Sequence, residues 1–160
     1  MTAQIRGREM NTATLKIFFS VLLICFFTVA SSLASDPAFR NGPGGLRIKD
    51  MQIGQGTAAV PGQVATIHFV GWLDNEGARG KEFFNSRRQR GEPVSFVIGT
   101  DGVMPAWNEG VLGMRPGGKR MLLVPPGMAY GQRQIDGQIP KNASLIFQIE
   151  MVRLEDAPGA

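Results

Sequence analysis

Single aromatic residues recur among glycines, prolines and charged residues between Lys81 and Tyr130. The aromatic side chains of a hydrophobic core usually lie in apolar runs with a period of 2 or 3.6 residues. Here several of them flank turn-forming residues instead, as in Phe84-Asn85-Ser86 and Ala129-Tyr130-Gly131. This placement predicts a shallow apolar cleft that is lined by rings held on loops.

The chain has few residues that would suit metal binding, nucleophilic catalysis or phosphate binding. Cys25 is the only cysteine and His68 the only histidine, so the clustered ligands of a metal site are missing. No serine lies in a recognisable nucleophile elbow. The segment 113–120 contains a lysine but has neither the spacing nor the hydroxyl group of a phosphate-binding loop. The sequence therefore favours an activity that needs no nucleophile, metal or other cofactor.

The charge pattern argues against binding to nucleic acid. The formal net charge is +4 at pH 7, and the only tight basic cluster consists of Arg87, Arg88 and Arg90. A protein that neutralises phosphates needs a broader basic face than this. We therefore expect no nucleic-acid partner and interpret the three arginines as a solvated loop.

An antiparallel sheet is predicted to hold the cleft. Alternating or β-rich patterns indicate six strand segments, and an arginine-rich bulge separates the third from the fourth. These segments are Leu46–Met51, Val64–Trp72, Glu82–Ser86, Val94–Ile98, Lys119–Val124 and Ser144–Leu154. One segment is predicted to be helical, because Pro105 suits a first helical turn and Gly113 a helix stop. The predicted fold class is α+β, an antiparallel sheet that covers one short helix.

The order and spacing of short motifs along the chain strongly resemble those of the FKBP-type peptidyl-prolyl cis-trans isomerases. The motifs are Phe84-Asn85-Ser86, Arg90-Gly91-Glu92-Pro93, Phe96-Val97-Ile98-Gly99, Trp107-Asn108-Glu109-Gly110-Val111, Gly117, Pro125 to Ala129-Tyr130-Gly131, Ile139-Pro140 and Leu145-Ile146-Phe147. The resemblance implies one isomerase domain at 46–155, in which a twisted antiparallel β-sheet wraps around one short α-helix.

The resemblance also implies a pocket for proline without a metal or cofactor. Trp107 falls at the position of the pocket floor, and Tyr130 falls where the family's tyrosine hydroxyl meets a substrate or inhibitor carbonyl. The expected catalytic residues are Tyr130, Asn85, Trp107 and Phe147. The expected substrate-binding residues are Phe69, Phe84, Val94, Val103, Met104, Trp107, Tyr130, Ile139 and Phe147. Macrolides of the FK506 and rapamycin type are implied as inhibitors.

Two positions depart from the usual pattern of the family. Asn85 stands where an aspartate is usual, and Phe69 stands where a tyrosine is frequent. Our hypothesis is that this pair was replaced together, which leaves the pocket less polar on one side. Outside the pocket, Phe96, Leu122 and Ile149 are interpreted as ordinary core residues.

The N-terminal segment has the pattern of a secretory signal peptide. Basic residues precede the apolar run 17–30, and Ser32 and Ala34 fill the two small positions before a cleavage site. We expect a signal peptide at 1–34, a flexible lead-in at 35–45 and a C-terminal tail at 156–160. Export to a bacterial periplasm is the main expectation. An uncleaved inner-membrane anchor and a chloroplast-lumen location are the alternatives.

Two functions remain open at the level of the sequence. The first is a prolyl isomerase that assists the folding of exported proteins, because uncatalysed X–Pro isomerisation is slow enough to limit folding. The second is a non-catalytic chaperone or adaptor that binds prolyl segments, which Asn85 favours slightly. The chain has no separate helical dimerisation region or large chaperone insert, which argues against the second function. We expect a monomer.

Overall fold

The structure, a computed structural model, describes residues 38–157. The predicted signal peptide, the first residues of the lead-in and the end of the C-terminal tail lie outside this range. Within it, none of the helices has the length and apolar character needed to span a membrane.

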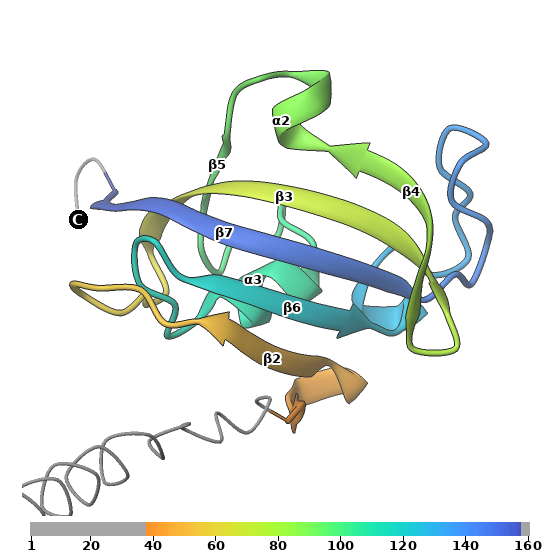
Figure 1. The fold of residues 1–160 in the computed structure, drawn as a ribbon, viewed down its shortest axis with the longest axis horizontal. Coiled ribbons are helices and arrows are strands. Elements are labelled where there is room, and N and C mark those ends of the chain that lie inside the picture. The colour runs from red at the N-terminus through yellow and green to blue at the C-terminus, as the bar shows by residue number, and fades with distance from the viewer. Residues whose placement is uncertain (1–37, 158–160) are drawn as a thin grey trace, which may run out of the picture. The chain divides into compact units, whose positions relative to one another are not determined.

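One antiparallel sheet forms the body of the described chain, as the sequence predicts (Figure 1). It has seven strands, one more than the six predicted segments. The strands run in the order β1-β2-β6-β7-β3-β4, and β5 pairs with β3 beside this path. The strands are β1 (Arg40–Asn41), β2 (Arg47–Gln52), β3 (Gln63–Asn75), β4 (Ala78–Asn85), β5 (Val94–Val97), β6 (Lys119–Val124) and β7 (Leu145–Asp156). The helical segments are α2 (Ser86–Gln89), α3 (Pro105–Val111) and the 3-10 turns η1 (Pro43–Gly45) and η2 (Pro126–Met128).

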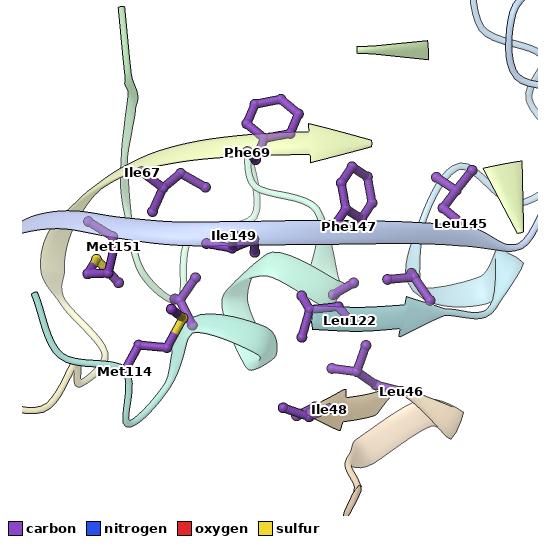
Figure 2. Close-up of a cluster of buried hydrophobic side chains, with 14 of the residues drawn as sticks. Leu46, Ile48, Ile67, Phe69, Met114, Leu122, Leu145, Phe147, Ile149 and Met151 are labelled. Atoms are coloured by element: carbon purple, nitrogen blue, oxygen red, sulfur yellow. The ribbon is translucent and has the colours of Figure 1, made fainter. Parts of the chain in front are cut away.

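The core lies between the sheet and α3, which crosses one face of it (Figure 1). Alternate residues of β7 provide its centre, and these four side chains are at most 1% exposed: Leu145, Phe147, Ile149 and Met151 (Figure 2). The prediction that they share one face of the closing strand is confirmed. Helix α3 approaches β6 closely at Gly110, where an ideal Cβ atom would lie 2.3 Å from Cδ1 of Leu122. Only glycine allows this approach without a shift of its neighbours.

The strand β3 has two partners along one edge. Its first half pairs with β5 and its second half with β4, so the chain must leave the sheet between Asn85 and Val94. The sequence predicts an arginine-rich bulge in this interval. The structure has the four-residue helix α2 there, so the expectation of a single helical segment is wrong. The local pattern contains no apolar period that would reveal a helix of this length.

Part of the expected lead-in belongs to the fold. Arg40 and Asn41 form β1, which pairs with Ile48 and Arg47 of β2, and the ring of Phe39 lies 5.1 Å from the guanidinium carbon of Arg47. The expectation of a flexible segment is therefore wrong from Arg40 onward. Two-residue strands such as β1 are held by pairing and side-chain contacts, which leave little trace in the sequence.

A nearly buried arginine joins three parts of the fold. Arg120 on β6 is 4% exposed, and its Nε donates to Oδ1 of Asp50 on β2 at 2.6 Å. Its Nη1 donates to the carbonyl oxygens of Gly110 and Leu112, both at 2.8 Å, where α3 ends. The guanidinium therefore satisfies carbonyl groups that a helix C-terminus leaves without partners.

Candidate functional site

Two adjoining hollows open beside α3. The first hollow has a volume of about 330 Å³ and the second about 500 Å³, and they share Val94, Trp107 and Tyr130. The first hollow is lined by Phe69, Phe83, Phe84, Arg90, Val94, Trp107, Tyr130, Ile135, Asp136, Gln138, Ile139 and Phe147. The second is lined by Val94, Phe96, Asp101, Gly102, Val103, Met104, Pro105, Trp107, Ala129, Tyr130 and Arg133. Their volumes are those of sites for small molecules or short peptide segments.

Contacts between aromatic rings hold the floor of both hollows in place. The indole of Trp107 meets the ring of Phe69 edge to face at 4.6 Å and the ring of Phe147 at 5.7 Å between centroids. Phe96 adds a tilted contact at 5.7 Å. Each such pair is worth about 0.5–1.5 kcal/mol beyond the area it buries. The indole is thus fixed by rings from β3, β5 and β7, although it projects from a helix of only seven residues.

The wall formed by β3 and β4 contains two adjacent phenylalanines that both face the first hollow. Consecutive residues of a regular strand point to opposite faces. Here Gly71 pairs with Phe84 and Trp72 pairs with Glu82, so a β-bulge leaves Phe83 as the extra residue. Gly71 makes room for it, because an ideal Cβ at this position would lie 2.5 Å from Cζ of Phe83.

Three polar groups of residues that line the hollows are donors without acceptors. Among residues 38–157, the hydroxyl of Tyr130, the backbone N–H of Met104 and the buried Nε1–H of Trp107 make no hydrogen bond. Burial raises the pKa of the Tyr130 hydroxyl above its usual value, while Arg133 lowers it and Asp136 raises it. The hydroxyl therefore stays protonated at neutral pH and remains a donor.

The site has no evident machinery for covalent or metal catalysis. In the part of the chain that the structure describes, no three His, Cys, Asp or Glu side chains gather as metal ligands would. His68 lines neither of the two hollows, and its Nδ1 lies 3.0 Å from Oγ of Ser86. Burial lowers the pKa of His68, and Arg87 lowers it further, while Glu150 raises it. The arrangement can desolvate and orient an apolar ligand.

Most of the predicted binding residues come together. Those in the first hollow are Phe69, Phe84, Val94, Trp107, Tyr130, Ile139 and Phe147. Val103 and Met104 line the second hollow only. The first hollow also contains lining residues that the sequence did not indicate: Phe83, Arg90, Ile135, Asp136 and Gln138. Phe83 enters through the bulge, and the others come from loops whose paths depend on distant contacts.

Two residues lie in other surroundings than the sequence indicated. Phe96 is half-buried, packs against the core and also lines the second hollow, whereas Leu122 and Ile149 are fully buried as expected. Asn85, expected among the catalytic residues, lines neither of the two hollows. Its Oδ1 accepts a hydrogen bond from the backbone N–H of Arg88 at 3.2 Å, which makes Asn85 the N-cap of α2.

Replacing Asn85 by alanine should therefore affect stability more than activity. Loss of an N-cap costs about 1 kcal/mol, so we expect Asn85→Ala to lower the free energy of unfolding by this amount in urea denaturation. Asn85→Asp keeps an oxygen acceptor at the cap and should stay within about 0.5 kcal/mol of the natural chain. If alanine instead left stability unchanged, the capping role would be wrong.

Comparisons with known proteins agree with this geometry. The sequence model of the family described as FKBP-type peptidyl-prolyl cis-trans isomerase matches residues 55–152. A protein named FK506-binding protein from Neisseria meningitidis serogroup B is 41% identical over 111 residues, which are 69% of this chain and 97% of that protein. Among solved structures, that of FkpA from Escherichia coli has a TM-score of 0.66 at 32% identity and covers 91% of this chain. This chain covers 62% of the FkpA structure. The structure of AtFKBP13 has a TM-score of 0.63 at 38% identity, and the match covers 72% of this chain and 98% of that one.

Proposed function

The chain belongs to the FKBP-type peptidyl-prolyl cis-trans isomerases, and we propose that it catalyses X–Pro rotation by holding proline in the first hollow above Trp107. The observation that carries this proposal is the combination of a ring-lined floor with donors that have no partner in the described chain. Phe69, Phe84 and Phe147 line the hollow in which the proline ring would lie. Trp107, Tyr130 and Phe147 are the residues to which we assign the reaction.

The apolar lining supports a mechanism based on desolvation. Rotation about the peptide bond crosses a barrier of roughly 18–20 kcal/mol, because it breaks amide resonance. Water stabilises the planar, more polar amide better than the twisted one. A hollow that replaces water by aromatic rings therefore favours the twisted state relative to the planar state. No bond is formed or broken, and no proton is transferred.

The donors would orient the peptide around the rotating bond. Tyr130 lines both hollows, and Met104 lines the second hollow as the N-cap of α3. Each is suited to a substrate carbonyl oxygen. Two fixed donors hold the chain on either side of the ring while the X–Pro bond turns, which lowers the entropic part of the barrier.

A protease-free isomerisation assay on an Xaa-Pro tetrapeptide tests this proposal. We expect Tyr130→Phe to lower kcat/KM about fivefold, the effect of one neutral hydrogen bond. Because burial raises the pKa of Tyr130, its hydroxyl stays protonated, and kcat/KM of the natural chain should be constant between about pH 6 and pH 9. Absence of any acceleration would contradict the enzymatic function, and a bell-shaped pH profile would contradict the mechanism.

The alternative function is a non-catalytic module that binds prolyl segments as a chaperone or adaptor. It predicts that the same tetrapeptide binds without faster exchange between its cis and trans forms. Magnetisation-exchange NMR distinguishes the two functions directly, because it detects the interconversion of the bound peptide. Asn85, which favoured this alternative slightly in the sequence, lines neither of the two hollows.

The cellular setting belongs to the same proposal. We propose that the chain acts as a monomer on exported proteins, in a bacterial periplasm, after cleavage between Ala34 and Ser35. The intact mass of the protein recovered from cells tests the cleavage, and its mass in solution tests the monomer. FK506-type macrolides are proposed as inhibitors, since several relatives bear the name FK506-binding protein. Inhibition of the isomerisation assay by FK506 tests this point.

A further inference from the structure

We propose that Arg90 makes the isomerase selective for acidic residues directly before proline. The proposal rests on the proposed function, because it concerns the substrate of the same site. The group that would make the selection is the guanidinium of Arg90, an exposed residue that lines the first hollow. The chemistry it recognises is the carboxylate of a glutamate or aspartate in a Glu-Pro or Asp-Pro segment.

The side chain of Arg90 is available for such a contact. It lines the first hollow, and among residues 38–157 it forms no ion pair and no side-chain hydrogen bond. Only its backbone N–H is engaged, with the carbonyl oxygen of Ser86 at 3.1 Å, which holds the residue at the end of α2. The main chain is thus fixed while the charged group stays uncommitted.

The other side chains of α2 and its N-cap do not neutralise this charge. Asn85 is uncharged, and its side-chain oxygen is occupied by the N–H of Arg88. The two other arginines of α2 have partners of their own. Arg87 pairs with Glu150 at 3.0 Å, and Arg88 pairs with Glu82. Of the three arginines that follow one another closely here, only Arg90 lines one of the two hollows.

The lining of each hollow contains one basic and one acidic side chain. They are Arg90 and Asp136 in the first hollow and Arg133 and Asp101 in the second. Among the described residues, Arg90 is therefore the one cationic side chain that lines the first hollow, and a carboxylate on the substrate would pair with it rather than with Asp136.

The covalent structure of the substrate brings the residue before proline to this rim. The Cα atom of that residue is bonded to the carbonyl carbon of the rotating bond. When the proline ring occupies the first hollow, the preceding side chain must therefore leave from the edge of the same hollow. A glutamate at this place can accept hydrogen bonds from the planar guanidinium in a two-pronged arrangement.

The test compares acetylated tetrapeptides of the form Ala-Xaa-Pro-Phe in which Xaa is Glu, Gln, Lys or Leu. We expect the natural chain to give a higher kcat/KM for Glu than for Lys, and Arg90→Gln to reduce this ratio about two- to fivefold, as for an exposed ion pair. Arg90→Glu should invert the preference. Arg88→Gln is the matched control, since it removes an equal charge from the same helix outside both hollows, and it should leave the ratio unchanged. Sodium chloride at 0.5 M should weaken the preference.

The peptides separate failure of this proposal from failure of the proposed function. If no peptide, including the leucine one, isomerises faster, the enzymatic function itself is contradicted. If the leucine peptide is accelerated but Arg90→Gln leaves the Glu-to-Lys ratio unchanged, the selectivity is overturned while the enzymatic function stands. A second peptide series places Glu or Lys after proline. An Arg90 effect confined to that series would overturn the assignment to the preceding residue.

Discussion

Replacement of Trp107 by leucine should lower kcat/KM for a Leu-Pro tetrapeptide about 30-fold. The indole forms the floor of both hollows and is contacted by the rings of Phe69, Phe96 and Phe147. Truncation of a central aromatic anchor typically costs about 2 kcal/mol of binding free energy. If that interaction is lost in the transition state, the rate falls by the corresponding factor. Trp107→Phe keeps one aromatic ring in the floor and should lower kcat/KM by a smaller factor.

A matched control separates loss of the floor from loss of stability. Met151 is fully buried and lies at the end of the buried cluster away from Phe147 and Leu145 (Figure 2). Met151→Ala should lower the free energy of unfolding by about 2–5 kcal/mol and leave kcat/KM nearly unchanged at a temperature where the variant is folded. An activity of Trp107→Leu within threefold of the natural chain would show that the floor does not take part in the reaction.

Replacement of Arg120 by methionine should cause a large loss of stability. The guanidinium is almost fully buried, and its removal leaves the carbonyl oxygens of Gly110 and Leu112 without their donor and Asp50 with only a 3.9 Å contact to Arg40. Breaking a buried pair by removing one partner costs about 3–5 kcal/mol. The side chain of Asp50 is 28% exposed, so part of its hydration is recovered and the lower end of this range is expected. Urea denaturation measures the change.

An exposed pair on β7 provides the comparison for Arg120. Arg153 lies 2.9 Å from Glu155, and both side chains are at least half exposed. Arg153→Met should change the free energy of unfolding by less than about 1 kcal/mol, because an exposed ion pair contributes little. Adding Asp50→Asn to Arg120→Met should recover part of the loss, since the amide leaves no unpaired charge. Equal effects of the two methionine variants would show that the buried network is not important for stability.

The sequence predicted the parts of the fold that depend on local patterns. Alternation of apolar residues in β7 placed Phe147 on the buried face, because successive side chains of a strand must point to opposite faces. Pro105 marked the start of α3, because its fixed φ and missing N–H suit a first helical turn. The order of motifs then identified Trp107 and Tyr130 as residues of one pocket, and the structure brings both to the first hollow.

The errors arose where distant strands decide the local conformation. Helix α2 follows β4 and precedes β5, and these two strands pair with different halves of β3 along one edge. A helix of four residues has almost no sequence pattern of its own. The resemblance to a family placed Asn85 among the catalytic residues by position alone. In the structure its side chain satisfies the first turn of α2 instead. A capping role becomes visible only when the helix after it is known.

By itself, the sequence determined the chemical character of this protein: aromatic rings on turns, no clustered metal ligands and no nucleophile beside a base. These properties follow from residue types and short spacings, and they favour the proposed mechanism of desolvation and orientation. Only the tertiary structure decided which groups meet. The bulge opposite Gly71 turned Phe83 inward, and the partners of Arg87 and Arg88 left Arg90 as the uncommitted charge at the rim. Such outcomes depend on pairing between strands and on charges far apart in the chain, which no local pattern records.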